Sequence, residues 1–184
     1  MNKIKLSRYL SYILRHKPEA AGITLTKDGY ARVSDLIKGI NNTGRYIDMD
    51  LLEEIVRTDE KGRYSFNIDK TMIRANQGHS LPVKIHFETV SPDDVPEFLL
   101  HGTSTNIKDE IYKYGIKPMT RQHVHLSADI ETAETVGKRH GKPYIFQIDS
   151  RKMAKDGIPF YLSENNVWMT DYVHPKYIVC GNYY

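Results

Sequence analysis

Apolar and polar positions follow a helical spacing near the start of the chain. Leu6, Leu10 and Leu14 share one face of a predicted helix, and Pro18 ends it because the residue before a proline is pushed out of the helical region. Two further helices and a hairpin follow in the pattern of a winged helix, a lobe that often binds nucleic acid, although a fold alone establishes no function. The expected elements after the first helix are a short strand before the Asp28-Gly29 turn, a helix capped by Ser34 or Asp35, a helix over 48–59, and a hairpin over 62–76 around Asp69-Lys70.

The pattern changes beyond residue 96 to short strands and turns with two helical stretches. A segment rich in proline and extended residues, 81–96, marks the boundary. Gly115 and Gly141 close the two helices as C-cap glycines. The chain is therefore predicted to be an α+β protein of two lobes. The expected helices cover 105–115 and 129–141, and the expected strands cover 98–103, 123–127, 144–149, 160–163, 166–170 and 177–181.

Composition narrows the class of protein without fixing its function. Lys and Arg total 26 against 23 Asp and Glu, and the pI is about 8.8, a mild excess that suits a local anion site better than general coating of DNA. The single cysteine, Cys180, excludes an internal disulfide framework and a cysteine-rich zinc site, and is typical of a reducing compartment. The sequence shows no apolar signal segment and no run long enough to span a bilayer, so we expect a soluble cytoplasmic protein.

The end of the first helix carries Arg15, His16 and Lys17, three side chains that can meet a phosphate. Cations in a last turn also suit the negative end of the helix dipole, so a purely structural role explains them as well. Taken alone, this segment favours the structural interpretation. A phosphate-binding role therefore depends on the evidence of the other motifs.

Two histidine-containing segments in the second lobe point to chemistry. His101 ends an apolar strand and is followed by Gly102, which lets a ligand approach the backbone, and then by two hydroxyl side chains. His123 and His125 share one face of a later strand, and Ser127 follows them. This pair invites a metal site, but closed zinc sites take four ligands and no Cys, Asp or Glu stands at ligand spacing beside the pair, so no metal is expected. Partly buried histidines bonded to the backbone are the structural alternative.

The motifs together resemble the RNA 2′-phosphotransferases of the KptA type, which remove a splice-junction 2′-phosphate from tRNA by using NAD. They stand in family order across almost the entire chain: LSYILRHKP, DGYARVSDLI, KGRY, IRANQGHS, HGT, RQHVHLSAD, VGKRHGKP and NVWMTDYV. The resemblance implies a winged-helix lobe over 1–85 that binds RNA phosphate, and an ADP-ribosyltransferase-like lobe over 86–184 whose two small sheets surround an NAD cleft. It also explains why an NAD user lacks the G-x-G-x-x-G turn of a Rossmann lobe.

The resemblance also implies four catalytic residues. The family's Arg-His pair falls on Arg15 and His16, and its two further arginines fall on Arg63 and Arg121. Guanidinium groups match the oxygens of a phosphate and cannot act as bases, so proton transfer at neutral pH falls to His16. The first helix would then end where it does because its last turn delivers these side chains into a cleft that faces the NAD lobe.

NAD sites in this superfamily are marked by three strand positions, here His101, His125 and Val167. Relatives that modify proteins commonly carry a glutamate at the third position, and the nearby Glu164 is explained more simply as a turn residue. Asn166 stands where a glycine is expected, but asparagine tolerates a left-handed backbone, so the turn can survive. The residues expected to position NAD are His101, Gly102, Thr103, His125, Leu126, Ser127 and Val167.

Contacts to the RNA strand are expected from a glycine-containing turn and from helix ends. Gly78 opens the backbone of a polar turn that can hold phosphate, although a capped turn that leaves the hairpin is the structural alternative. Lys138, Arg139 and His140 can touch phosphates or remain solvated at a helix end, and for Lys138 we favour the solvated interpretation. The expected RNA contacts are Lys17, Asn76, Gln77, Gly78, His79, Ser80 and Arg139.

The implied reaction has two steps and two substrates, NAD and RNA with an internal 2′-phosphate. The phosphate attacks the ribose carbon that bears nicotinamide, and a hydroxyl of that ribose then attacks phosphorus, which yields 2′-hydroxyl RNA, nicotinamide and ADP-ribose 1″,2″-cyclic phosphate. Arginines aimed at the phosphoryl oxygens support the second step without a metal. We expect a monomer with no membrane partner. Two alternatives stay open: an ADP-ribosyltransferase that caps terminal phosphates of nucleic acid, and a non-catalytic RNA-binding protein that senses NAD.

Overall fold

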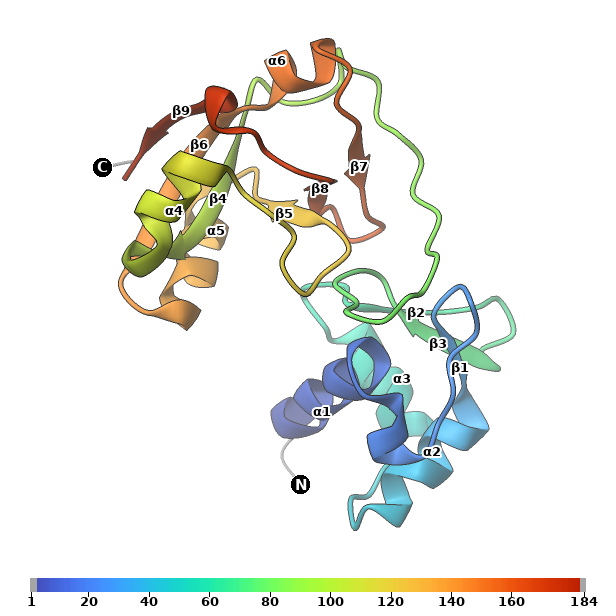
Figure 1. Ribbon diagram of the computed structural model, residues 1–184. Helices are drawn as coiled ribbons and strands as arrows, with labels where there is room; N and C mark the ends of the chain where they lie inside the picture. The colour runs from blue at the N-terminus through green and yellow to red at the C-terminus, as the bar shows by residue number, and fades with distance from the viewer. Residues whose placement is uncertain (1–2, 183–184) are drawn as a thin grey trace. The chain divides into compact units, whose positions relative to one another are not determined.

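The computed structural model describes residues 3–182, which form helices and small antiparallel sheets (Figure 1). The chain divides into two compact units, unit 1 (Met1–His86) and unit 2 (Phe87–Tyr184). Each unit has its own hydrophobic core and its own sheets, so the predicted α+β class is confirmed. No helix among the described residues has the length and apolar character needed to cross a membrane.

Unit 1 contains three α-helices and a three-stranded antiparallel sheet of order β1-β3-β2. The predicted hairpin is present as β2 and β3, in which Tyr64 lies opposite Ala75 and Phe66 lies opposite Ile73. The remaining strand, β1, pairs with the other edge of β3. The elements are α1 (Lys3–Arg15), the 3₁₀ helix η1 (Pro18–Ala21), β1 (Tyr30–Arg32), α2 (Val33–Asn42), α3 (Met49–Arg57), β2 (Tyr64–Phe66) and β3 (Met72–Ala75).

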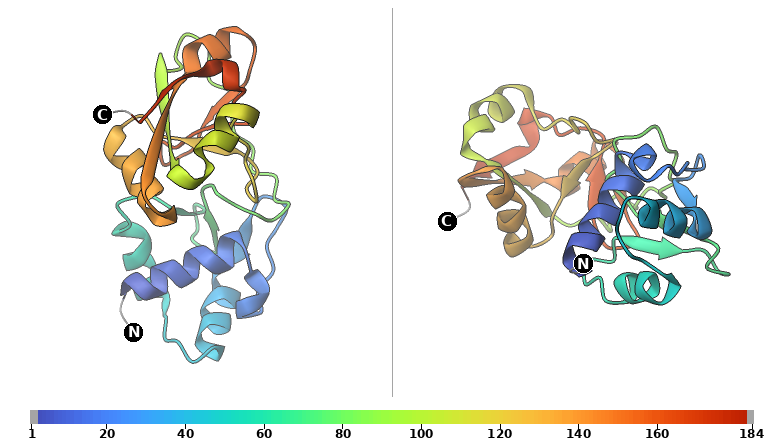
Figure 2. Two further views of the ribbon diagram at one scale, coloured as in Figure 1. Left: turned by 60° about the vertical axis from the view of Figure 1, so that its left-hand side comes forward. Right: turned by 90° about the horizontal axis from the view of Figure 1, so that it is seen from below.

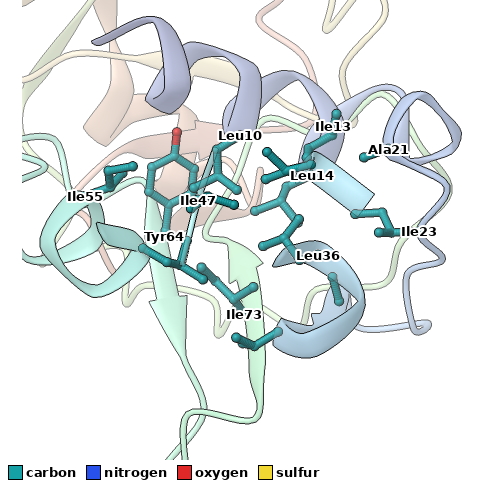
Figure 3. Close-up of a cluster of buried hydrophobic side chains, with 14 of the residues drawn as sticks. Leu10, Ile13, Leu14, Ala21, Ile23, Leu36, Ile47, Ile55, Tyr64 and Ile73 are labelled. Carbon is teal, nitrogen blue, oxygen red and sulfur yellow. The ribbon is translucent and has the colours of Figure 1, made fainter. Parts of the chain in front are cut away.

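The core of unit 1 holds α1 firmly in place. Leu10 and Leu14 are fully buried, and each buried leucine contributes roughly 1.5–3 kcal/mol by leaving water. Figure 3 shows these side chains packed with residues of α2 and of the sheet, and Tyr64 among them. The Tyr64 hydroxyl donates a hydrogen bond of 2.6 Å to the carbonyl of Ser7 on α1. The position of the last turn of α1 is therefore set by the core beneath it.

Two local predictions in unit 1 are wrong. Residues 23–26 form no strand, and the first strand comes after the turn instead. The second helix begins without a side-chain cap from Ser34 or Asp35. Its first residue, Val33, donates its N–H to the carbonyl of Thr71 at 2.9 Å. The sheet thus satisfies a backbone donor that a cap would otherwise bind.

Unit 2 contains two three-stranded antiparallel sheets, of order β4-β6-β9 and β5-β8-β7. Short helices connect their strands, and one of them, α6, was not expected from the sequence. The elements are β4 (Phe98–Ser104), η2 (Thr105–Ile107), α4 (Lys108–Tyr114), β5 (Val124–Leu126), α5 (Ile130–Gly137), η3 (Lys138–His140), β6 (Pro143–Asp149), α6 (Ser150–Lys155), β7 (Phe160–Leu162), β8 (Trp168–Thr170), η4 (Pro175–Tyr177) and β9 (Ile178–Gly181).

Helices α4 and α5 cover opposite faces of the β4-β6-β9 sheet (Figures 1 and 2). Leu100 of β4 packs with Ala133 of α5, whereas its neighbour Leu99 packs in the larger cluster that includes Ile111 of α4. Because side chains alternate along a strand, His101 lies on the same face as Leu99, away from α5. The predicted NAD-binding histidine is therefore on the face of the sheet opposite α5.

The two sheets of unit 2 meet beside this histidine. Leu100 and Ser127 exchange two backbone hydrogen bonds of 2.8 Å each. This contact is an isolated bridge between β4 and the residue after β5. The end of β5 is thus fastened to the middle of β4. This junction brings two of the predicted NAD-binding motifs, which begin 20 residues apart at His101 and Arg121, to one place.

Candidate active site

The last turn of α1 is tied to the turn that follows β3. The Ser80 N–H donates to the carbonyl of Arg15 at 3.1 Å, so it satisfies one of the free carbonyls at the helix end. The Ser80 hydroxyl lies 2.9 Å from Nδ1 of His16. The predicted Arg-His pair and the predicted phosphate-binding turn therefore belong to one structure within unit 1.

The backbone of this turn passes close to the Arg15 side chain. Gly78 has a φ of 83°, in the left-handed region that favours glycine. A Cβ at this position would lie 3.7 Å from Nη1 of Arg15. The turn can therefore bring its main chain beside the guanidinium without an intervening side chain.

His79 is buried at the centre of a group of cations. Only 2% of its surface is exposed, and burial lowers its pKa to about 4, with further lowering by the positive charges of Arg15, His16 and Arg74. The ring is thus neutral at physiological pH, and every charge that acts on it is positive. We call Arg15, His16, Arg74 and His79, with the turn 76–80, the cationic cluster.

Asn76 anchors the loop that carries the predicted catalytic Arg63. The side chain is 4% exposed. Its Nδ2 donates to the carbonyl of Gly62 at 2.8 Å, and its backbone N–H donates to the carbonyl of Arg63 at 2.9 Å. Its Oδ1 has no hydrogen-bond partner within residues 3–182, which is an uncommon state for a buried oxygen. Asn76 is therefore first a structural residue, with one acceptor left over.

The Arg63 side chain is held by Asp59, a residue that the sequence analysis did not select. Asp59 accepts a hydrogen bond of 2.5 Å from the Arg63 N–H, and its other oxygen forms an ion pair with the guanidinium. The side chain of Asp59 is 6% exposed and that of Arg63 is 30% exposed. The carboxylate is thus the fixed partner, and the arginine keeps a surface for a ligand.

In unit 2, His101 is oriented by a backbone carbonyl. Its Nδ1 lies 3.1 Å from the carbonyl oxygen of His125. Since a carbonyl can only accept, Nδ1 carries the proton of the neutral ring and Nε2 keeps its lone pair. Burial lowers the pKa of His101, the His125 carbonyl opposes this shift, and the positive charges of Arg121 and His140 add to it. His101 can therefore accept a hydrogen bond from a hydroxyl group.

The other predicted NAD-binding residues surround this histidine along the strands. Thr103 is buried two positions further along β4. Leu126 lies opposite Trp168 between β5 and β8, and Ser127 lies opposite Leu100 of β4. The turn before Val167 closes with Asn166 in the left-handed region, at a φ of 58°, so asparagine replaces the expected glycine there without loss of the turn.

A second group of positive charges lies near His101. Arg121, in the loop before β5, has a lowered pKa, chiefly through desolvation and then through the charge of Arg139. Arg139 and His140 belong to η3, directly after α5. The structure thus brings Arg121 and His140 close enough to act on the pKa of His101, and Arg139 close enough to act on that of Arg121. Lys138 instead pairs with Glu134 at 3.1 Å along the helix surface, in agreement with a solvated role.

Three predicted positions have simpler structural explanations. A Cβ at Gly102 would overlap the carbonyl of Ala133 on α5, so this glycine is required for packing. Glu164 lies in the exposed turn between β7 and β8. His123 packs between the rings of Phe87 and Tyr161, with Asp171 at 3.8 Å. Among the described residues, no group of three His, Cys, Asp or Glu side chains could hold a metal ion.

The predicted residues therefore form two separate groups, one in each unit. Arg15, His16 and the turn 76–80 meet in unit 1, while His101, Arg121 and Arg139 meet in unit 2. Sequence reasoning overlooked Asp59 and Arg74, and it named His140 beside Arg139 without selecting it. The four-residue spacing of Asp59 and Arg63 was a usable signal, and the others stood inside motifs from which only neighbouring residues were chosen.

Comparison with known proteins identifies one family. Residues 1–172 match the model of the "RNA 2'-phosphotransferase, Tpt1 / KptA family". A "Probable RNA 2'-phosphotransferase" of Fusobacterium nucleatum is 52% identical over 178 residues, which cover 96% of this chain and 98% of that protein. Proteins with the same description from Flavobacterium johnsoniae and Acaryochloris marina are 47% and 44% identical, over 94% and 95% of this chain and 93% and 94% of their own lengths.

Proposed function

The chain belongs to the RNA 2′-phosphotransferase, Tpt1/KptA family of transferases, and we propose that it transfers an internal 2′-phosphate of RNA to NAD. The RNA keeps a 2′-hydroxyl, and the phosphate leaves as ADP-ribose 1″,2″-cyclic phosphate together with nicotinamide. The proposal assigns the RNA phosphate to residues of unit 1 and the dinucleotide to residues of unit 2.

The observation that carries this proposal is the cationic cluster. His79 is buried, and the positive charges of Arg15, His16 and Arg74 add to the lowering of its pKa. Such a group attracts an anion, and a phosphate monoester with nearly two negative charges suits it. Gly78 adds a stretch of main chain beside Arg15, where backbone N–H groups can donate to phosphate oxygens.

His16 is the proposed proton carrier. When its Nδ1–H donates to the Ser80 hydroxyl at 2.9 Å, the neutral ring has its lone pair on Nε2. That nitrogen can take the proton of an attacking hydroxyl at physiological pH. Arginine cannot replace it because a guanidinium keeps its charge and proton.

The residues of unit 2 fit a dinucleotide with two ribose groups and a pyrophosphate. NAD, when bound, supplies the ribose that takes up the phosphate. His101 offers Nε2 as an acceptor for a ribose hydroxyl because His125 holds its Nδ1 proton. Thr103 lies in the same strand as His101, Ser127 pairs with Leu100 of that strand, and Val167 directly precedes β8. Arg121 and Arg139 bring positive charge for phosphate oxygens, and Arg121 is also the proposed stabiliser of charge at the transferred phosphorus.

The fold supports the same division of roles. We infer that unit 1 is the winged-helix lobe, since it combines three helices with the β2-β3 hairpin. We infer that unit 2 is the ADP-ribosyltransferase-like lobe, since its two small sheets meet at Leu100 and Ser127 beside His101. Lys17, Gln77 and Ser80 remain proposed contacts of the RNA strand.

The test is a short RNA with one internal 2′-phosphate, incubated with and without NAD and followed by mass analysis of RNA and nucleotides. We expect loss of the 2′-phosphate only with NAD, release of nicotinamide, and no effect of a chelator. The same RNA with a 2′-hydroxyl and a 5′-phosphate is the control. Free inorganic phosphate as the product would contradict the proposal, and ADP-ribose attached to the control RNA would point to a capping activity instead.

A further inference from the structure

An open groove of about 420 Å³ runs along α1 in unit 1, outside the cationic cluster. One wall is the face of α1 that carries Lys3, Ser7, Arg8 and Ser11, and the other is the loop between α3 and β2, which includes Lys61 and Arg63. The groove therefore shares Arg63 with the proposed site and extends away from it over residues that have no role so far.

The groove attracts anions. Lys3, Arg8, Lys61 and Arg63 line it, against two acidic residues, Asp59 and Glu60. Lys3 also forms an ion pair with Glu54, at 2.5 Å. The nearly buried carboxylate of Asp59 is occupied by the Arg63 side chain and backbone. No carboxylate of the described residues lies within ion-pair distance of Arg8, which is exposed. The charge of Arg8 is therefore available to an external partner.

Its floor is polar. The Tyr64 hydroxyl donates to the Ser7 carbonyl at 2.6 Å, so its oxygen accepts from the Ser11 hydroxyl at 2.7 Å. Two hydroxyl side chains of α1 thus face the groove above a satisfied tyrosine. A sugar-phosphate chain can form further hydrogen bonds with these hydroxyls, which an apolar peptide or a lipid cannot do.

The groove leads to the proposed phosphate site along a single row of the helix. Lys3, Ser7, Ser11 and Arg15 follow each other at intervals of four residues, which form one ridge on a helix surface. Their span is about 18 Å, long enough for a few nucleotides of one strand. The opposite wall is fixed to the same site, because Asn76 bonds the carbonyls of Gly62 and Arg63.

We propose that this groove binds the backbone phosphates of the RNA strand next to the reacting 2′-phosphate, with Arg8 and Lys61 as its main contacts. The proposal rests on the proposed function, because it takes Arg15 and Arg63 as the reacting end of the groove. It assigns a partner, flanking single-stranded RNA, to Arg8, which lies outside the motifs of the family resemblance, and to Lys61, which begins the KGRY motif.

The experiment compares two substrates of the full chain. One is a dinucleotide with a 2′-phosphate at its junction, and the other is the same junction extended by about six nucleotides on each side, enough to fill the groove. Arg8→Gln and Lys61→Gln should each raise KM for the extended RNA roughly five- to tenfold. Each should also reduce the slope of log affinity for that RNA against log salt concentration by about one. KM for the dinucleotide, KM for NAD and kcat should stay unchanged.

Matched variants separate this effect from general loss of charge or of folding. Lys5→Gln removes an exposed cation of α1 that does not line the groove, and it should leave every constant unchanged. Arg8→Lys should restore most of the affinity for the extended RNA. Three results would contradict the proposal that the groove binds RNA: equal changes in KM with both substrates, an equal effect of Lys5→Gln, or no change in the Arg8 and Lys61 variants.

The experiment distinguishes an error in the groove proposal from an error in the proposed function. Turnover of the dinucleotide with NAD depends only on the proposed function. Direct binding of the extended RNA, measured without NAD by fluorescence anisotropy, depends on the groove and needs no turnover. Loss of binding in Arg8→Gln and Lys61→Gln but not in Lys5→Gln would support the groove in either case.

Discussion

The imidazole of His16 and the hydroxyl of Ser80 lie 2.9 Å apart, although 64 positions separate them in the chain. The backbone of Ser80 also bonds the carbonyl of Arg15 at 3.1 Å. One residue thus closes the end of α1 with its main chain and orients the proposed proton carrier with its side chain. These two roles can be separated, because alanine keeps the first and loses the second.

The Ser80→Ala variant should keep its fold and lose part of its activity. A hydrogen bond of this kind is worth about 1 kcal/mol, so kcat should fall about fivefold. The acidic arm of the pH–rate profile should shift, since the tautomer and orientation of the proposed base His16 are no longer set. His16→Ala should cost more, on the order of 10²–10⁴ in kcat. An unchanged pH profile in Ser80→Ala would show that the contact does not orient a catalytic group.

Arg63→Ala and Arg121→Ala should slow the second chemical step more than the first. Both arginines are assigned to charge that grows on phosphoryl oxygens, while the first step attacks carbon. Removal of one such donor typically costs on the order of 10²–10³ in rate. RNA that carries ADP-ribose on its 2′-phosphate should therefore accumulate in a time course followed by mass spectrometry. Equal loss of both steps, with no such species at any time, would assign these residues to substrate binding instead.

Asp59→Asn tests whether Arg63 has to be positioned. The amide can still accept the Arg63 N–H, but it loses the charge that holds the guanidinium. We expect kcat to fall roughly tenfold, as for loss of one hydrogen bond to a charged group, with little change in KM for NAD. Glu60→Gln, at an exposed neighbouring carboxylate, is the matched control. If kcat falls equally in both variants, the activity depends on the negative charge of the loop and not on the specific contact between Asp59 and Arg63.

Stability should fall when the pH drops from about 6.5 to about 4, the range between the ordinary pKa of histidine and that of buried His79. In this range the unfolded chain binds a proton at His79 and the folded chain does not, so acid favours unfolding, by roughly 3 kcal/mol in total. The lowered pKa values of His101 and His123, both chiefly caused by burial, act with the same sign.

Denaturant unfolding of His79→Asn at several pH values measures this contribution. The variant should show a weaker dependence on pH between about 6.5 and 4 than the parent protein. His86→Asn, at an exposed histidine of the same unit, should leave the dependence unchanged. A parent-like slope in His79→Asn would show that the acid sensitivity arises elsewhere.

Local patterns predicted the elements, and their limits have physical causes. The alternation around Asp69-Lys70 was sufficient for the β2-β3 hairpin because the turn and both strands are neighbours in sequence. The start of α2 was missed because its first N–H is bound by Thr71, which lies 38 positions further along the chain from Val33. A strand-like apolar run directly before α6 hid that helix, which has only six residues and takes its cap from Asp149.

The site was predictable in its residue types and less so in its supporting contacts. Family motifs supplied His16 and His101, but the partner that orients each of them stands in a different motif. Periodicity along one segment carries no information about such pairs. The Asp59 contact is the exception, since a spacing of four residues places both side chains on one side of a turn.

Gly102 of the HGT motif serves the packing of β4 against α5. A glycine next to an active-site histidine suggests open space for a ligand, yet here any side chain would collide with the backbone of α5. The main chains of β4 and α5 are thus in direct contact at Gly102, and β4 cannot move closer to α5. His101 lies on the opposite face of this strand. A bulkier residue at Ala133 should therefore impair NAD binding from a distance, while changes on the solvent side of α5 should be silent. The histidine that we propose to bind NAD depends on this helix, although it lies on the opposite face of the sheet.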